Sequence, residues 1–362
     1  MSKRFSIIFS VAIFLIVASY FVFINTRTDA SQKQENLTST IPKLIPKDNS
    51  LAVVQNVEVK PEIALTTTTL LFVGDIMLDR NVNKKMQTVG AGDYNFPFAK
   101  LKLPEADFRI ANLEGPVTDN KSVVNPANLQ FTFSPKFLVP IKNNFDVVSL
   151  ANNHTDNFGR KGLETTKKYL EEEGIKYFGN AYNDQPLAVI IEKNNLKIGL
   201  VGYNQLASLG FNEVIKEIKT LRTKVDILIV MPHWGVEYQP EKPSSLQKSQ
   251  GRQFIDAGAD LVMGGHPHVI QPIEEYKGKY IFYSLGNFIF DQYFSKETMQ
   301  GLTVLLEIGA DKTLSFVLNP IQLNLDYQPS VAEDRKQAIL DFISKYSIVS
   351  NEEQLKISSG VL

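Results

Sequence analysis

The chain has only four histidines, and each lies in a short polar motif that follows an apolar run. The motifs read SLANNHTDNFG, MPHWGVEY and GGHPHVIQP, and they contain His154, His233, His266 and His268. Neutral imidazole is a ligand that Zn, Mn and Fe share. A chain that confines every histidine to such motifs is predicted to build one polar site suited to a divalent metal.

Two carboxylates occupy similar positions after earlier apolar runs. Asp75 follows TLLFVG, and Glu114 ends the segment RIANLE. Five runs, each expected to be a strand, therefore deliver polar side chains just beyond their carboxyl ends, where ligands bind in α/β sheets. Each motif alone has a simpler interpretation as a turn, a helix cap or a packed histidine. GHPH is the hardest to explain by packing, and the five motifs in this order favour a shared site.

The composition restricts the chemistry of that site. The chain contains no cysteine, so disulfides and thiolate ligands are excluded and any metal must be held by nitrogen and oxygen atoms. A net charge of -1 gives no electrostatic reason to expect a nucleic acid partner.

The first 68 residues differ from the rest. Residues 5–24 carry no charge and are long enough to cross a bilayer as a helix. Lys3 and Arg4 precede them, which predicts a cytoplasmic N-terminus and an extracytoplasmic main domain. A cleaved signal peptide is the alternative. We therefore expect residues 1–24 to be a cytoplasmic tip and a transmembrane signal anchor, and the polar, aromatic-free residues 25–68 to be a disordered tether.

From residue 69 onward, short apolar strands alternate with amphipathic helices, which predicts a layered α/β fold. The expected strands cover residues 70–73, 108–111, 146–150, 196–201, 226–231 and 261–263, and the expected helices cover 160–173, 212–223 and 244–257. After His268 the pattern changes to antiparallel pairs with turns at KGK and ADK. The main domain is expected over residues 69–325. A C-terminal helix, over 331–346, and a tail are expected within 326–362.

Six motifs in order resemble those of a known family. GDIMLDR, NLEGPVT, SLANNHTDNFG, HWGVEY, GGHPHVIQP and YSLGNFIFD are similar to the capsule-synthesis protein A (CapA) family, the poly-γ-glutamate synthesis and export proteins. More broadly they resemble calcineurin-like metallophosphoesterases. The resemblance covers about residues 69–325. It implies a metallophosphoesterase-like sandwich of two mixed β-sheets flanked by helices, here preceded by one transmembrane helix, with one or two Mn, Fe or Zn ions.

The resemblance also implies ligand roles. The first metal position would take Asp75, Glu114 and His268, with Glu114 as the bridging carboxylate. The second would take Asn153, His233 and His266. The phosphoesterase pattern has a further histidine where this chain has Met77, and a thioether is a poor ligand for hard metals. We therefore expect the second position to be the more secure one.

His154 is the candidate general acid, which would protonate the leaving group. The family usually has an aspartate three residues after this histidine, where the present chain has Asn157. Asp156 lies one place earlier and is the carboxylate expected to act with His154.

Three further residues follow strands and are candidates for contact with substrate. Asn204 and Asn287 are predicted to hold the substrate, with a turn as the alternative interpretation for each. Trp234, with Tyr238, is predicted to wall the pocket, with packing as the alternative.

Three functions remain open from the sequence. The first is a membrane-anchored, metal-dependent hydrolase-type protein that acts on an anionic polymer, with polymer-synthase membrane subunits as partners. The second is a non-catalytic polymer-binding or assembly subunit, which the methionine at position 77 favours. The third is a general metal-dependent phosphodiesterase, which rests on fold analogy alone.

Overall fold

The computed structural model describes residues 67–362 except 101, 126–127 and 208–209. The predicted transmembrane helix and residues 25–66 of the predicted tether therefore lie outside the described residues. The tether was predicted to extend to residue 68, but Thr68 is buried and is the first residue of a strand. Within the described ranges, no helix has both the length and the apolar character needed to cross a bilayer. The described residues all belong to one compact unit, Ile63–Leu362.

The first large sheet has eight strands in the order β16-β15-β14-β1-β2-β5-β6, with β13 beside β1. Its strands are β1 (Thr68–Ile76), β2 (Phe108–Leu113), β5 (Val147–Ser149), β6 (Lys176–Phe178), β13 (Asn287–Ile289), β14 (Gln300–Ile308), β15 (Leu314–Leu323) and β16 (Pro329–Val331). The neighbours β1, β2, β5 and β6 are parallel, whereas β14 is antiparallel to both β1 and β15. The sheet is therefore mixed, and its parallel half carries the first three motifs.

The second large sheet has six strands in the order β11-β12-β10-β9-β8-β7. Its strands are β7 (Ala188–Lys193), β8 (Leu196–Asn204), β9 (Ile227–His233), β10 (Leu261–Met263), β11 (Ile273–Tyr276) and β12 (Lys279–Phe282). The central strands β8, β9 and β10 are parallel, and the two edge strands are antiparallel to their neighbours. A small hairpin, β3 (Val123–Asn125) with β4 (Asn128–Gln130), stands apart from both large sheets.

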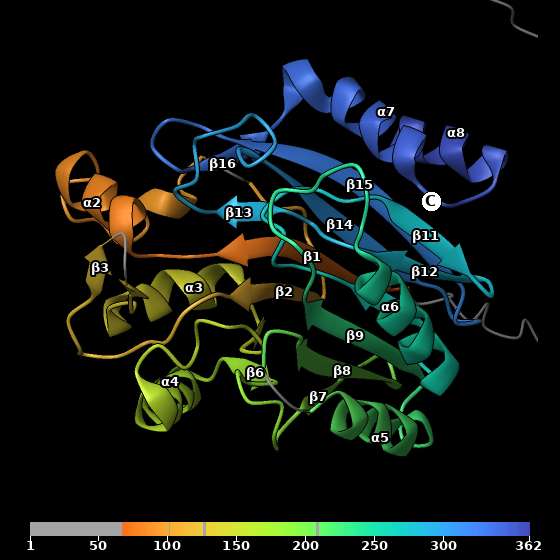
Figure 1. Ribbon diagram of the computed structural model, residues 1–362, viewed down its shortest axis with the longest axis horizontal. Helices are drawn as coiled ribbons and strands as arrows, with labels where there is room; N and C mark the ends of the chain where they lie inside the picture. The colour runs from red at the N-terminus through yellow and green to blue at the C-terminus, as the bar shows by residue number, and fades with distance from the viewer. Residues whose placement is uncertain (1–66, 101, 126–127, 208–209) are drawn as a thin grey trace, which may run out of the picture. The chain divides into compact units, whose positions relative to one another are not determined.

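The first five α-helices of the described residues cover the outer faces of the two sheets, and the last two pack against the apolar cluster between the sheets (Figure 1). These helices are α2 (Arg80–Thr88), α3 (Leu138–Asn144), α4 (Gly159–Glu173), α5 (Phe211–Arg222), α6 (Ser245–Ala257), α7 (Lys336–Tyr346) and α8 (Asn351–Ser359). The apolar sides of α3 and α4 pack against the first sheet, and those of α5 and α6 against the second. Near the C-terminus, α7 and α8 lie side by side close to β15.

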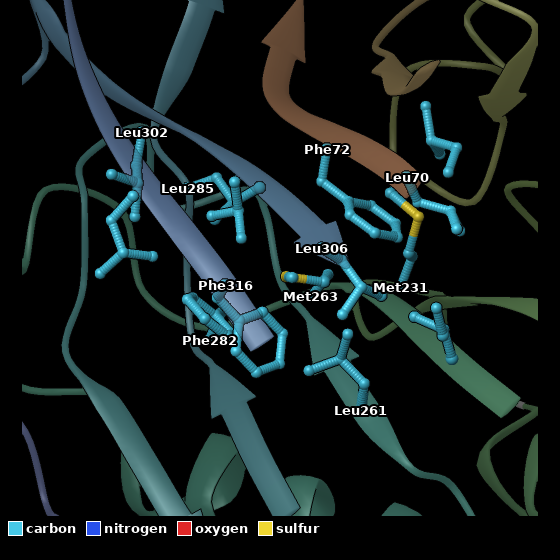
Figure 2. Packing of buried hydrophobic residues seen from close by; sticks show 14 of the residues in the cluster. Leu70, Phe72, Met231, Leu261, Met263, Phe282, Leu285, Leu302, Leu306 and Phe316 are labelled. Atoms are coloured by element: carbon cyan, nitrogen blue, oxygen red, sulfur yellow. The ribbon is translucent and has the colours of Figure 1, made fainter. Parts of the chain in front are cut away.

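The alternating side chains of β1 explain how one strand serves two cores. Leu70 and Phe72 enter the cluster between the sheets, whereas Leu71 and Val73 face the helices on the other side. Because successive side chains of a strand point to opposite faces, a strand covered on both sides is apolar throughout. Figure 2 shows the inter-sheet cluster, in which Leu306 of the first sheet lies near Met263 of the second. This packing sets the distance between the two sheets that carry the motifs.

The predicted mixed α/β architecture with more than one sheet is confirmed, and so are the predicted strands and the helices α4, α5 and α6. The C-terminal prediction was partly wrong. Residues 329–331 form β16, the expected helix starts only at Lys336, and the expected tail contains α8. Ser350 Oγ accepts a hydrogen bond from the Glu353 backbone, and the Glu353 side chain accepts one from the Ser350 backbone. This capping box starts α8 and was readable in the sequence SNEE.

Truncating one inter-sheet side chain should destabilise the protein strongly. Leu306 is fully buried, so Leu306→Ala is expected to lower the free energy of unfolding by about 2–5 kcal/mol through lost burial and a residual cavity. Leu355 is 73% exposed on α8, and the same change there should stay within about 0.5 kcal/mol. Chemical denaturation of the two variants measures both effects, and equal losses would contradict the assignment of the core.

Candidate metal centre

The carboxyl ends of strands from both sheets meet at one place. Asp75 lies in β1, Glu114 follows β2, and His233 ends β9. His266 and His268 follow β10, and all five side chains are buried. The backbone N–H of His266 donates to Asp75 Oδ2 at 3.0 Å, although 191 positions separate the two residues. The structure therefore brings the predicted ligands from both halves of the chain together.

The first predicted ligand set is assembled around Glu114. Ligand atoms of Asp75, Glu114 and His268 all lie within 4.8 Å of one another. His268 places Nε2 3.7 Å from Glu114 Oε1 and Nδ1 3.6 Å from Asp75 Oδ2. Two carboxylates and one imidazole are a donor set that suits Mn, Fe or Zn.

The second predicted set is more compact. His233 Nε2 lies 2.9 Å from Asn153 Oδ1 and 3.2 Å from His266 Nδ1. Two atoms bound to one ion at about 2.1 Å stand about 3.0–3.4 Å apart in octahedral or tetrahedral geometry. The three side chains already have nearly that spacing, so they fit a shared cation with small adjustments.

The carboxylate of Glu114 gives an independent sign that a cation belongs here. Both of its oxygens are buried and accept no hydrogen bond from the residues that the structure describes. Burial raises the pKa of Glu114 well above its usual range, and the charges of Asp75 and Glu237 raise it further. Burial also raises the pKa of Asp75 to about 6, despite hydrogen bonds from Asn112 and the His266 backbone. A buried carboxylate without a partner is costly, and a bound cation removes that cost.

Asn112 ties the two sets together. Its Nδ2 donates to Asp75 Oδ1 at 2.8 Å and lies 3.2 Å from His233 Nδ1, while its Oδ1 accepts from Asn152 at 3.0 Å. Neither asparagine was predicted from the sequence to have a role in the site. The available signal was their position inside NLE and ANNH, two residues before Glu114 and one residue before Asn153. Polar groups that orient ligands in this way are a regular part of metal sites.

Backbone geometry places the two histidines of GHPH. His266 and His268 have φ angles of 93° and 57°, in the left-handed region that residues with a side chain rarely adopt. The residue before them is glycine for a steric reason, because a Cβ at Gly265 would come within 2.7 Å of Asp75 Oδ1. The close approach lets the His266 N–H reach Asp75, which holds the loop in its strained form.

Asn287, which was predicted to hold substrate, lies against one of the ligand histidines and positions it. It is fully buried, and its Oδ1 lies 3.0 Å from His268 Nδ1. Its Nδ2 donates to the Thr298 carbonyl and to Gln292 Oε1, which fixes the orientation of the amide. His268 Nδ1 therefore carries the proton in this hydrogen bond, and Nε2 faces Glu114 with a free lone pair.

Two other residues predicted to contact substrate have surroundings that match their alternative interpretations. The Trp234 ring is fully buried against Phe254 and Tyr283, and its Nε1 donates to the Tyr283 carbonyl at 2.8 Å. Asn204 closes a turn, because its Nδ2 donates to the Ala181 carbonyl and its Oδ1 accepts from a backbone N–H two residues later. In both cases packing and turn formation account for the side chain.

The partner of His154 also differs from the prediction. His154 Nδ1 lies 3.3 Å from Asn157 Oδ1, and Asn157 Nδ2 donates to the Phe131 carbonyl, which fixes the amide. The charge of Asp156 instead affects Tyr182. Burial is the main cause that raises the pKa of Tyr182, and the Asp156 charge raises it further. The chain places an amide where a carboxylate was expected, so Asp156 does not orient His154.

His154 nevertheless faces the centre. Its Nε2 lies 4.0 Å from Glu114 Oε1, and burial lowers its pKa to about 4. It is therefore neutral near pH 7, with the Nδ1 proton directed to Asn157 and the Nε2 lone pair directed inward. This state suits a proton acceptor, and the acid role of His154 stays a prediction.

Glu237 is a candidate ligand that the sequence analysis missed. Its carboxylate lies within 4.8 Å of ligand atoms of both His266 and His268. The next residue, Tyr238, has a φ of 62° and donates its N–H to the Pro267 carbonyl at 2.9 Å, which fixes the loop beside GHPH. Met77, by contrast, is buried in an apolar cluster, and its sulfur accepts from the Asp79 N–H. Glu237 thus offers the centre a donor that position 77 does not.

The chain matches known proteins across this region. The family model described as "Bacterial capsule synthesis protein PGA_cap" matches residues 69–292, which contain the whole candidate site. The chain is 30% identical over 297 residues to the "PGA biosynthesis protein CapA" of Bacillus subtilis strain 168, covering 76% of this chain and 77% of the relative. It is 33% identical over 248 residues to the "Capsule biosynthesis protein CapA" of Bacillus anthracis, covering 62% and 60%.

Among solved structures, a phosphatase from Mycoplasma pneumoniae aligns with a TM-score of 0.48 and 14% identity, over 77% of this chain and 100% of that one. A calcineurin-like phosphoesterase, YfkN, from Bacillus subtilis aligns with a TM-score of 0.32 and 14% identity, over 74% and 91%.

The buried histidines should make the metal-free chain sensitive to acid. Burial lowers the pKa of His266 from 6.5 to about 4, so the unfolded chain takes up this proton at a higher pH than the folded one. Its contribution to stability is complete above pH 6.5 and is lost as the pH falls towards 4. Since one pH unit corresponds to about 1.4 kcal/mol, the loss reaches roughly 3 kcal/mol.

Denaturation of the chelator-treated chain between pH 7 and pH 4 measures this loss, with His266→Gln as the comparison. The wild type should lose more stability than the variant over that interval. Equal losses in the two proteins would contradict the expected titration of His266. Asp75 acts in the opposite sense in both proteins, because its raised pKa favours the folded state as the pH falls through 6.

Proposed function

Because this chain belongs to the bacterial capsule synthesis protein family PGA_cap, as its motifs predicted, we propose that it acts in the synthesis or export of an anionic capsule polymer of the poly-γ-glutamate type. The proposed action is through a metal-dependent, hydrolase-type site. One observation carries this proposal: the buried Glu114 carboxylate has no hydrogen-bond partner among the described residues and lies within 4.8 Å of ligand atoms of Asp75 and His268. The names of the two Bacillus relatives supply the polymer class.

The residues fit one or two divalent ions. In the proposal the first ion is held by Asp75, Glu114 and His268, and the second by Asn153, His233 and His266. Glu237 lies beside His268 of the first set and His266 of the second and is a further donor. When bound, such ions supply an activated water and stabilise charge that develops on a substrate. Burial keeps these histidines neutral near pH 7, so one ring nitrogen of each carries no proton, as metal binding requires.

The protein's own groups supply the remaining chemistry. His154 takes up or delivers a proton at Nε2, the atom that faces Glu114. Asn157 orients the His154 ring through Nδ1. Asn112 contacts both Asp75 and His233 and fixes their relative positions. Two mixed sheets with helices on their outer faces support the metallophosphoesterase-like sandwich that the motif resemblance implies.

A non-catalytic polymer-binding or assembly subunit is the second candidate. Met77 favours it, because the side chain at that position is packed into the apolar core and offers the centre no ligand. Glu237 opposes it, because its carboxylate lies beside His266 and His268. A test of hydrolysis separates the two functions.

We also propose that the chain is a single-pass membrane protein with its N-terminus in the cytoplasm and residues 69–325 outside. The uncharged residues 5–24 and the preceding Lys3 and Arg4 support this topology. An extracytoplasmic domain meets an exported polymer where it leaves the membrane. Membrane subunits of a polymer synthase are then the natural partners.

Metal binding should depend on the two ligand sets in the purified full-length chain. Elemental analysis is expected to find about one or two Mn, Fe or Zn per chain. Combining His233→Ala with His266→Ala should remove the second ion, and Glu237→Gln should weaken Mn²⁺ binding about tenfold or more, measured by electron paramagnetic resonance titration.

The matched control is Glu241→Gln, which changes a glutamate of the same loop that binds Tyr346. This variant should bind Mn²⁺ like the wild type. A full-length chain that takes up no divalent metal would contradict the proposed centre.

Hydrolysis of defined substrates tests the chemistry. The metal-loaded chain is expected to cleave poly-γ-glutamate faster than a phosphodiester such as bis-p-nitrophenyl phosphate. His154→Ala should reduce the rate by about 100-fold or more, because a proton-transfer group is lost, while the metal content stays unchanged. Cleavage of the phosphodiester alone would favour a general phosphodiesterase, and no cleavage of either substrate would favour the non-catalytic subunit.

A further inference from the structure

Arg80 stands beside the centre but belongs to neither ligand set. It is the first residue of α2 and lies five residues after Asp75. Its φ angle is 53°, a left-handed conformation that strains a residue with a long side chain. Such strain persists only where neighbouring contacts hold it, and it is concentrated at functional sites. The position of this guanidinium therefore needs an explanation.

Asp291 fixes one edge of the guanidinium. Arg80 Nε donates to Asp291 Oδ2 at 3.2 Å, and Nη2 donates to Asp291 Oδ1. The Asp291 side chain is 1% exposed and also accepts from the backbone and side chain of Asn81, both at 3.1 Å. A two-point contact of this kind fixes the plane of the guanidinium. In the described part of the chain, the Nη1 edge donates no hydrogen bond and remains available.

Two phenylalanine rings place the guanidinium between the histidines of the centre. The guanidinium carbon lies 5.9 Å from the Phe131 ring centroid and 5.6 Å from that of Phe290. Phe131 packs on His154 at 4.6 Å, and Phe290 packs on His268 at 4.5 Å. Both histidines direct Nε2 toward Glu114 Oε1, at 4.0 and 3.7 Å. The two phenylalanine rings that contact Arg80 therefore also pack on the two histidines that face the Glu114 carboxylate.

The charge of Arg80 reaches the centre. Burial, Asp75 and Glu237 all raise the pKa of Glu114, and the positive charge of Arg80 opposes them. The same charge adds to burial in lowering the pKa of His154 and of His268. The Arg80 side chain is 19% exposed, so solvent and solutes have access to it.

We propose that Arg80 binds an oxyanion of the substrate, a carboxylate or a phosphate, in front of the metal centre. The free Nη1 edge of a planar guanidinium matches the geometry of such groups, and Asp291 orients it for binding. This inference rests on the proposed function, because an anionic polymer presents an oxyanion at every repeat. A structural ion pair between Arg80 and Asp291 is the competing interpretation.

The experiment measures binding of inorganic phosphate and of a glutamate oligomer to the full-length chain by calorimetry, with and without bound Mn²⁺. Arg80→Asn removes the cation while asparagine tolerates the left-handed backbone. It should weaken anion binding by about 10- to 100-fold, since a hydrogen bond to a charged group is lost. Arg80→Lys keeps the charge but loses the planar guanidinium, so its anion affinity should lie between those of the wild type and Arg80→Asn.

Arg160→Asn is the matched control. Arg160 also pairs with a carboxylate, Asp184 at 2.7 Å, and lies over an aromatic ring, Tyr182 at 4.1 Å. This variant should bind both anions like the wild type. The anion whose affinity depends more on Arg80 identifies the group that the subsite takes.

The outcomes separate the two proposals. Unchanged anion affinity in Arg80→Asn, or a loss of bound Mn²⁺ in that variant, would overturn the oxyanion role, and the second result would show a structural pair. A chain that takes up no metal but loses anion binding in Arg80→Asn would overturn the metal centre and support the oxyanion role.

Discussion

The burial of the Glu114 carboxylate is the constraint on which the rest of the site depends. Its two oxygens are enclosed, and no described residue donates a hydrogen bond to them. Imidazole nitrogens of His154 and His268 face Glu114 Oε1 at 4.0 and 3.7 Å. Imidazoles that burial keeps neutral do not balance a negative charge. A divalent cation does balance this charge. The presence of such a cation also explains why donors from Asp75, His233 and His266 converge here.

The two-sheet architecture brings the other ligands to the buried Glu114 carboxylate. β1 and β2 of one sheet and β9 and β10 of the other end at the same place, so rigid strands deliver ligands that are far apart in sequence. Asn112 then links Asp75 of the first sheet to His233 of the second. The apolar cluster between the sheets fixes their spacing, and through it the distances between the two ligand sets. The packing between the sheets and the positions of the ligands are therefore coupled, and the buried amide of Asn112 is one of the links.

Much of this could be predicted from the sequence, because the motifs are local. Asp75, Glu114 and the four histidines each follow an apolar run, and parallel strands bring such positions together. The orientation of Trp234 could not be predicted, because it depends on Phe254 and Tyr283 from other elements.

Other features depended on geometry that the sequence does not display. The turn at Asn204 is closed by Ala181, and the place of Glu237 depends on the left-handed conformation of Tyr238. The local backbone direction likewise decides that the side chain beside His154 Nδ1 is Asn157 and not Asp156. The helix α8, by contrast, was readable from its capping box.

The most direct test of the central claim is anomalous diffraction at the manganese edge from crystals of the full-length chain grown with Mn²⁺. A peak is expected about 2.0–2.4 Å from a Glu114 oxygen and from at least one of the ligand histidines. An electron density map in which Glu114 accepts hydrogen bonds and no such peak lies nearby would contradict the metal centre.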